Sequence, residues 1–194
     1  MTNNSQIMSD ARASLNGKWP LAIGTFLIAF LISLGVSLIP YAGQIIYFLV
    51  TAPLVVGISF FALKIARDQD PKTDDLFFSF NNNFGNAILA NLLVGIFAFI
   101  GFILLIIPGI IVSLALSQTW FILAENPSMG SYEAIIKSKD MMKGYKWQYF
   151  KIGLRLLLLG LLCLLTLGIG FLWLIPYQYV VYAKFYEEVK AANA

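Results

Sequence analysis

The chain has 194 residues, of which 59% are hydrophobic and only 12% are charged. Soluble domains are usually about a quarter charged, so this composition excludes an ordinary soluble fold and predicts a membrane protein. The sequence has no histidine and one cysteine, Cys163, which excludes an internal disulfide and a zinc site made of Cys and His ligands. Because Cys163 lies in an apolar run, we expect it to be packed rather than reactive.

The first apolar run begins at Trp19 and is about 20 residues long, which is enough to cross a bilayer and too long for the core of a signal peptide. We therefore expect it to stay as the first transmembrane helix, and a second crossing to end near Ala66. Two conformations stay open for residues 40–53. We favour a long second helix that begins at Tyr41 and kinks at Pro53, and the alternative is a short interfacial or re-entrant piece.

The central run from Phe84 to Ala124 has no charge and is about twice the length of one crossing. Pro108 and Gly109 interrupt it near the middle. Proline removes a backbone donor, and backbone groups freed in this way need water or protein partners, which are found at the membrane surface. The pattern predicts a hairpin of two crossings with its turn at Pro108–Gly109, on the far side of the membrane.

Two further crossings are expected, from Tyr149 to about Leu167 and from Phe171 to about Lys184. The predicted fold class is an all-α polytopic membrane bundle of about six transmembrane helices arranged as three hairpins. In this single domain the successive parts are an N-terminal segment (1–18), hairpin one (19–67), a loop (68–83), hairpin two (84–124), an amphipathic segment (125–147), and hairpin three with the C-terminal tail (148–189).

The positions of the charges test this topology. With six crossings, every Asp, Glu, Lys and Arg falls in the N-terminal segment, the loop 68–83, the segment 125–147 or the tail, or at a helix end beside them. The other three turns carry none. Because positive charge is retained in the cytoplasm, the pattern predicts that the charged side and both termini are cytoplasmic, in a bacterial plasma membrane.

The sequence also shows one pattern three times along the chain. Each has a polar lead-in, an apolar helix, a turn, a proline and a second apolar helix, and the aligned second helices end at Lys64, Glu125 and Lys184. Two interpretations are open: three hairpins around a pseudo-threefold axis, or a chain of helical hairpins without true repetition.

The segment 125–147 is basic and amphipathic. Ser131 is a candidate helix N-cap, and the residues expected toward one side of the helix are Tyr132, Ile135, Ile136, Met142 and Tyr145. Its four lysines are the candidate contacts for anionic lipid: Lys137, Lys139, Lys143 and Lys146. The alternative is a connecting segment that only packs on the bundle and helps to set orientation.

Polar groups at membrane depth are the other candidates for a site. Arg155 lies about two turns into the fifth helix, where it can reach the interface, pair with an acid such as Glu125, or line a cavity that binds an anionic group. Gln118 and Gln178 are candidates for the polar lining of the same cavity or for hydrogen bonds between helices. Together these four residues form the predicted intramembrane polar site.

The stretches LLIIPGIIVSLALSQTWFILAENP, EAIIKSKDMMKGYKWQYF, LTLGIGFLWLIPY and AKFYE resemble a bacterial family of multi-pass membrane proteins. This family is known as domain of unknown function 975 and is common in Gram-positive bacteria. The resemblance extends from about Ala11 to Glu188. It implies an integral membrane protein and supplies no substrate, reaction or catalytic residue.

The sequence thus favours a non-enzymatic protein of the cell envelope that binds lipid or a partner protein through its basic segments. The expected partners are the lipid bilayer and either anionic lipids or another membrane protein, and a homo-oligomer is left open. No cofactor, metal or nucleic-acid partner is expected. No catalytic residue is expected either, because the sequence has no base that titrates near neutral pH. The alternative is a small transporter or channel whose uncharged or anionic substrate passes near Arg155.

Overall fold

The structure is a computed structural model that describes residues 3–40 and 43–193. All regular elements in these ranges are helices. In chain order they are α1 (Asn4–Ser14), α2 (Trp19–Ser37), α3 (Gly43–Ala66), the 3₁₀ helix η1 (Thr73–Phe77), α4 (Phe78–Asn82), α5 (Phe84–Leu104), α6 (Ile106–Leu116), α7 (Thr119–Glu125), α8 (Ser131–Met141), α9 (Lys146–Leu165) and α10 (Phe171–Ala192). The fold is the all-α polytopic bundle that the sequence predicts.

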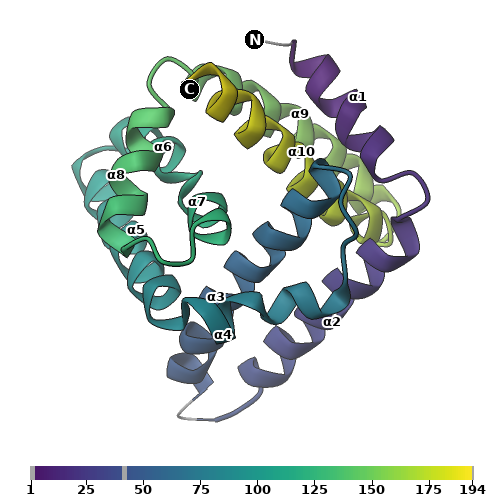
Figure 1. Cartoon of the computed structure of the whole chain (residues 1–194), viewed down its shortest axis with the longest axis horizontal. Helices are drawn as coiled ribbons and strands as arrows, with labels where there is room; N and C mark the ends of the chain where they lie inside the picture. The colour runs from purple at the N-terminus through teal and green to yellow at the C-terminus, as the bar shows by residue number, and fades with distance from the viewer. Residues whose placement is uncertain (1–2, 41–42, 194) are drawn as a thin grey trace.

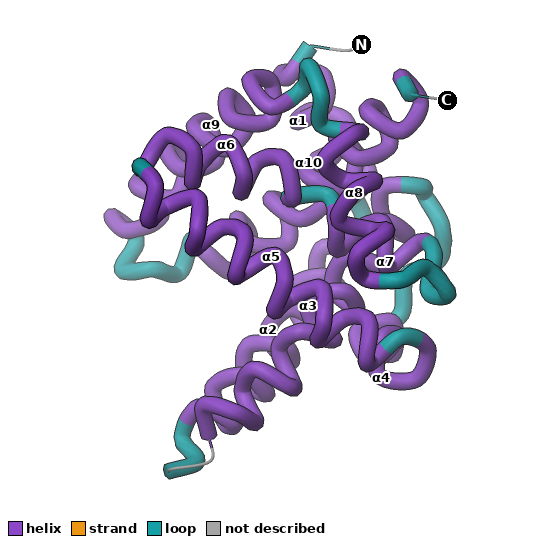
Figure 2. The backbone as a smooth tube through the Cα atoms, turned by 90° about the vertical axis from the view of Figure 1, so that its left-hand side faces the viewer, coloured by secondary structure: helices purple, strands orange, loops and turns teal. Residues whose placement is uncertain are grey.

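The helices repeat one arrangement three times along the chain (Figure 1). A short helical segment precedes each hairpin: α1 precedes α2–α3, η1 and α4 precede α5 with α6–α7, and α8 precedes α9–α10. In Figure 2 the turns of the three hairpins point toward the left of the view, whereas α4, α7 and α8 lie toward the right. The predicted order of three hairpins with polar lead-ins is therefore confirmed.

Helix α3 is at the centre of the packing. It contacts α2, η1, α4, α5, α7 and α10, and its side chains Phe61, Leu63 and Ile65 are fully buried. The closest approach is at Gly57, where an added Cβ would lie 1.9 Å from the Leu76 carbonyl oxygen of η1. Only a residue without a side chain allows η1 to cross α3 at this distance.

The turn of the second hairpin lies at Leu105, just before the predicted Pro108–Gly109. Leu105 is extended and separates α5 from α6. Pro108 falls in the first turn of α6, where the helix needs no backbone donor. Gly109 faces α5, because a Cβ built on Gly101 would lie 3.0 Å from the Gly109 Cα. The hairpin is confirmed, but its glycine permits close helix contact rather than the turn itself.

The segment before Pro53 is helical. Helix α3 begins at Gly43 and continues through Pro53, so the long second helix is confirmed over the re-entrant alternative. Tyr41, its predicted first residue, lies outside the described residues. Pro176 lies inside α10 in the same way.

Within the described residues, five helical segments are long and apolar enough to cross a membrane, where about six were expected: α2, α3, α5, Ile106–Glu125 and α9. The fourth is divided into α6 and α7 by a break at Ser117 and Gln118. Helix α10 begins where the sixth crossing was predicted, at Phe171, but it is not among the five. Its second half carries Lys184, Glu187, Glu188 and Lys190, which leaves only a short apolar part.

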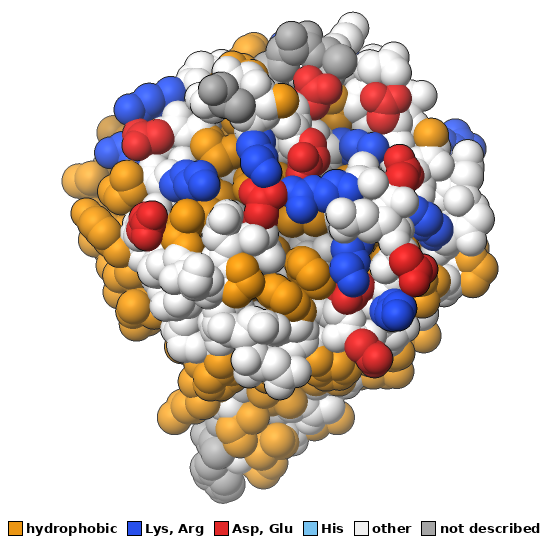
Figure 3. Space-filling model, viewed as in Figure 1, with side chains coloured by type: hydrophobic (Ala, Val, Ile, Leu, Met, Phe, Trp, Pro, Cys, Tyr) orange, Lys and Arg blue, Asp and Glu red, His pale blue; other side chains and the backbone are white. Residues whose placement is uncertain are grey.

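Charged side chains gather on one face, formed by α8, residues 68–77 and the ends of α3, α7 and α10. We term it the charged face, and Figure 3 looks onto it. The hairpin turns, in contrast, contain no charged residue. Large apolar side chains are exposed at these turns, including Ile107 at 71% and Leu167 at 94%. A surface of this kind is suited to lipid rather than to water.

Candidate functional site

An ion cluster joins the ends of α3, α7 and α10 at the charged face. Arg67, directly after α3, donates hydrogen bonds to Glu125 of α7 and to Glu187 of α10, the latter at 2.7 Å. Glu125 also accepts hydrogen bonds from Tyr186 at 2.8 Å and from Lys190 at 2.6 Å. Beside the cluster, the Lys184 ammonium donates to the last carbonyl of α3 at 2.5 Å.

The central carboxylate of the ion cluster is fully used by the cluster's own members. Both oxygens of Glu125 accept hydrogen bonds, and its side chain is 16% exposed. Burial disfavours the charge on Arg67, but the hydrogen bonds to Glu187 and Glu125 outweigh it and raise the pKa of the guanidinium. A carboxylate whose two oxygens are both used by neighbouring helices is suited to holding three hairpins together rather than to binding a ligand.

The structure does not bring the predicted intramembrane site together. Arg155 is exposed and donates to the Ser5 hydroxyl of α1 at 3.1 Å, because its face of α9 is turned toward α1. Glu125 instead belongs to the ion cluster. The Gln178 amide approaches only the Tyr182 hydroxyl, at 3.5 Å. Of the options that the sequence left open for Arg155, pairing with Glu125 is therefore wrong.

Gln118 is the most buried of the predicted polar residues. Its side chain is fully buried at the break between α6 and α7, and its backbone N–H donates to the Ser138 hydroxyl of α8 at 3.1 Å. Its amide nitrogen donates to Ser117 at 2.9 Å, whereas its amide oxygen has no hydrogen-bond partner among the described residues. Gln118 thus links a helix break to α8 and does not line an open path.

The basic segment forms α8, and its lysines lie on the charged face. Lys137, Lys139 and Lys143 are exposed, and Lys146 is partly exposed at the start of α9. Lys143 pairs with Asp140 at 2.8 Å, and this contact lowers the pKa of that carboxyl. Among the residues that the structure describes, the other three lysines make no ion pair. Four cations therefore remain close together at one edge of the bundle.

Two details of the α8 prediction are corrected. Ser131 is the first residue of the helix and not its N-cap, which is Gly130, and the Ser131 hydroxyl donates to the Asn86 carbonyl of α5 at 2.9 Å. The apolar residues also divide between two sides. Ile135 and Met142 are buried against the bundle, whereas Tyr132 and Ile136 are exposed. One side of α8 therefore packs on the bundle, and a second side, with Tyr132 and Ile136, has apolar residues that stay exposed.

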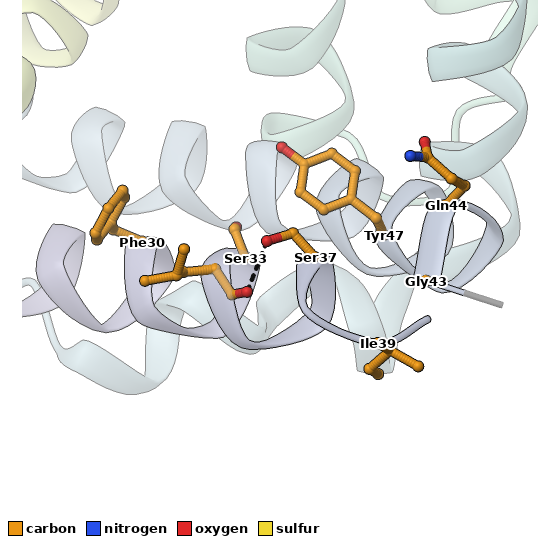
Figure 4. A pocket seen from close by; sticks show the side chains of 8 residues that line it. Phe30, Ser33, Ser37, Ile39, Gly43, Gln44 and Tyr47 are labelled. Atoms are coloured by element: carbon orange, nitrogen blue, oxygen red, sulfur yellow. Dashed lines mark hydrogen bonds between the residues drawn. The ribbon is translucent and has the colours of Figure 1, made fainter. Parts of the chain in front are cut away.

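A depression of about 560 Å³ lies at the turn of hairpin one (Figure 4). Ser33 and Ser37 of α2 line it together with Gln44 and Tyr47 of α3. Both serine hydroxyls donate to carbonyls of their own helix, at 2.9 Å and 2.7 Å. Because both hydroxyls already bond within α2, neither serine is free to bind a ligand. Across the described part of the chain, no group of three His, Cys, Asp or Glu could hold a metal ion.

The residue that sequence reasoning missed is Arg67. The aligned second helices place charges at Lys64, Glu125 and Lys184, and in the structure these three helix ends meet. The threefold pattern therefore already marked the three helix ends that meet, but nothing in its spacing distinguishes Arg67 from Lys64. Lys64 pairs instead with Asp75 of η1, at 2.7 Å.

Comparison with known families places the chain. The sequence profile described as "Protein of unknown function (DUF975)" matches residues 1–108 and residues 96–193, which together cover nearly the whole chain. The chain belongs to the DUF975 family. This result confirms the resemblance drawn from the sequence motifs. Comparisons with curated proteins and with solved structures gave no match. Because the DUF975 description assigns no function, any function must be argued from the molecule itself.

Proposed function

We propose that this DUF975 protein is a non-enzymatic protein of the bacterial plasma membrane that binds anionic lipid headgroups through α8. The observation that carries the proposal is an exposed stripe on α8. Tyr132, Ile136 and Lys139 follow one another at helical spacing on α8, Lys143 is exposed in the turn that follows the helix, and Trp147 is exposed at the start of α9. Tyr132 is 63% exposed and Trp147 is 67% exposed.

This combination of residues matches the membrane interface. Aromatic rings are enriched at headgroup level, and aliphatic side chains enter the boundary with the acyl chains. Each lysine close to an anionic surface contributes roughly 1 kcal/mol to its attraction. A stripe that served only solubility would carry charges without exposed Tyr, Ile and Trp between them.

The same argument supports an orientation. The charged face gathers residues 68–77, α8 and the ends of α3, α7 and α10, the hairpin turns carry no charge, and cations are retained on the cytoplasmic side. In the proposed arrangement both termini and α8 are cytoplasmic, where anionic lipids attract basic segments. The transporter alternative has less support, since Arg155, Gln118 and Gln178 do not line one path.

The proposal is tested by neutralising the four lysines. The variant carries Lys→Gln at residues 137, 139, 143 and 146, and its matched control carries Lys→Arg at the same positions. Each protein is purified in mild detergent and titrated with phosphatidylglycerol or phosphatidylcholine, and bound lipids are counted by native mass spectrometry. We expect the Gln variant to lose the weaker, charge-dependent phosphatidylglycerol binding that adds lipids as the lipid concentration rises, by tenfold or more, and the Arg control to retain it, because headgroup attraction follows charge.

Equal phosphatidylglycerol binding by the wild type and the Gln variant would contradict the proposal. A protein partner that is lost from the Gln variant while lipid binding is unchanged would instead assign α8 to protein recognition.

A further inference from the structure

A second feature lies away from α8, on the third hairpin. A groove of about 520 Å³ is lined by residues of α1, α2, α9 and α10. Its α9 wall extends from Leu159 to Thr166, and its α10 wall from Gly170 to Tyr177. Seven helical residues rise about 10 Å, so the groove is about that long. One end lies at the hairpin turn, beside Thr166 and Gly170, and the other end lies toward the charged face.

The end toward the charged face carries a cation. Arg12 of α1 is the one charged residue in the described lining. The Tyr177 hydroxyl donates to the Met8 carbonyl at 3.0 Å, which fixes α1 against α10 at this end. The charge of Arg12 is close enough to act on the Tyr177 hydroxyl. Arg12 therefore lies at the Tyr177 end of the groove and not at the hairpin turn.

The Arg12 guanidinium is available for a ligand. Its side chain is exposed, and within the described ranges it makes no ion pair and no side-chain hydrogen bond. The nearest acid in sequence, Asp10, accepts a hydrogen bond from Gln6 instead. A guanidinium presents a planar set of donors that matches the oxygens of a phosphate. A free guanidinium above an apolar groove thus complements a molecule with an anionic head and an apolar tail.

The level of the cation in the membrane agrees with such a ligand. Trp19, at the start of α2, lines the groove with Arg12, and tryptophan is enriched at the depth of lipid headgroups. From there the apolar walls of α9 and α10 lead toward the hairpin turn. Trp173, which is half exposed, also lines the groove. The volume lies within the range of about 300–1,000 Å³ that is typical of ligand pockets.

We propose that this groove binds one anionic phospholipid of the surrounding bilayer, with its phosphate at Arg12 and part of one acyl chain between α9 and α10. The site differs from the α8 stripe, since no residue of α8 lines it. It also differs in kind: the stripe attracts a charged surface, whereas the groove holds a single molecule by head and tail together.

The experiment uses the full-length protein in mild detergent, with phosphatidylglycerol and phosphatidylcholine as probes in separate titrations. Native mass spectrometry counts the lipids that survive transfer. We expect one phosphatidylglycerol to bind more tightly than phosphatidylcholine. Arg12→Gln should reduce that preference about tenfold, the loss expected when one charge-assisted hydrogen bond to phosphate is removed. Arg12→Lys should restore part of it, because the charge returns without the planar donors.

A second variant tests the tail. Leu162 lines the groove and is 59% exposed, so Leu162→Trp adds bulk to the groove without changing charge. It should weaken both lipids at this site, with thermal unfolding in detergent confirming that the protein stays folded. The Gln variant of the four α8 lysines should keep the tightly bound lipid, so failure of the groove and failure of the α8 stripe give different results.

The proposal would be overturned by an undiminished phosphatidylglycerol preference in Arg12→Gln, or by equal binding of the two lipids to the wild type. A dimer that Arg12→Gln and Leu162→Trp both dissociate would overturn it as well, since the groove would then be occupied by a second copy of the chain.

Discussion

At the scale of residues, the ion cluster concentrates much of the tertiary specificity in one carboxylate. Glu125 accepts hydrogen bonds from Arg67, Tyr186 and Lys190, which belong to or follow two other helices. Tyr186 is fully buried, so its hydroxyl has no water to replace a lost acceptor. Removal of the charge on Glu125 would leave these donors poorly satisfied in a partly buried position.

We therefore expect Glu125→Gln to destabilise the protein by about 1–3 kcal/mol, the range for hydrogen bonds to a charged group. Thermal unfolding in detergent should show a midpoint lower by several degrees. Asp70→Asn makes the same chemical change at an exposed loop position and should leave the midpoint unchanged. Equal midpoints for both variants would show that the cluster contributes little to stability.

At the scale of elements, close helix contacts depend on glycine at a few positions. Gly57 lets η1 cross α3, and Gly101 with Gly109 lets α5 and α6 pack closely beside their turn. Gly24 and Gly95 have no such role: among the described residues, no atom beyond the adjacent backbone of the same helix lies within 4 Å of a Cβ built on either one. Hydropathy cannot distinguish these two classes, because the difference lies in what packs against each glycine.

Gly57→Ala should consequently destabilise the protein by about 3 kcal/mol or more, since the added Cβ would meet the Leu76 backbone and not a movable side chain. The unfolding midpoint should fall by roughly 10 °C. Gly24→Ala, a matched change in α2, should be neutral or slightly stabilising because alanine favours helix. A Gly57→Ala protein as stable as Gly24→Ala would refute the close crossing of α3 and η1.

At the scale of the whole molecule, charged side chains gather on the charged face (Figure 3), whereas exposed apolar side chains gather at the hairpin turns. This separation supports one orientation in a bilayer, because moving the charged segments through hydrocarbon would be very costly. It also places α8 and the Arg12 end of the groove toward the same side.

The orientation can be measured by cysteine labelling. In a Cys163→Ser background, Leu167→Cys places a thiol at the exposed turn of hairpin three, and Lys139→Cys places one on α8. A membrane-impermeant maleimide applied to intact cells should label Leu167→Cys and should reach Lys139→Cys only after lysis. The reverse pattern would show that the charged face is outside the cell.

Much of the fold follows from local sequence, but the candidate sites do not. Trp19 and Phe171 begin helices where the apolar runs begin. The hairpin near Pro108 could also be predicted, because the uncharged run around it is too long for one crossing. The pairing of Arg155 with Glu125 does not form, and the sequence could not have excluded it. Helical periodicity says which residues share a face of one helix, and it does not say which neighbouring helix that face meets.

The sequence by itself determined the membrane class, the helix order, the three hairpins and the placement of all charges toward one side, because each depends on hydropathy and spacing along the chain. Only the tertiary structure decided that Arg67 is the partner of Glu125, that α8 turns Tyr132 and Ile136 outward, and that Arg12 lies at the end of an apolar groove with no ion-pair partner among the described residues. Those facts depend on the rotation and crossing of packed helices, which side-chain contacts between distant segments set.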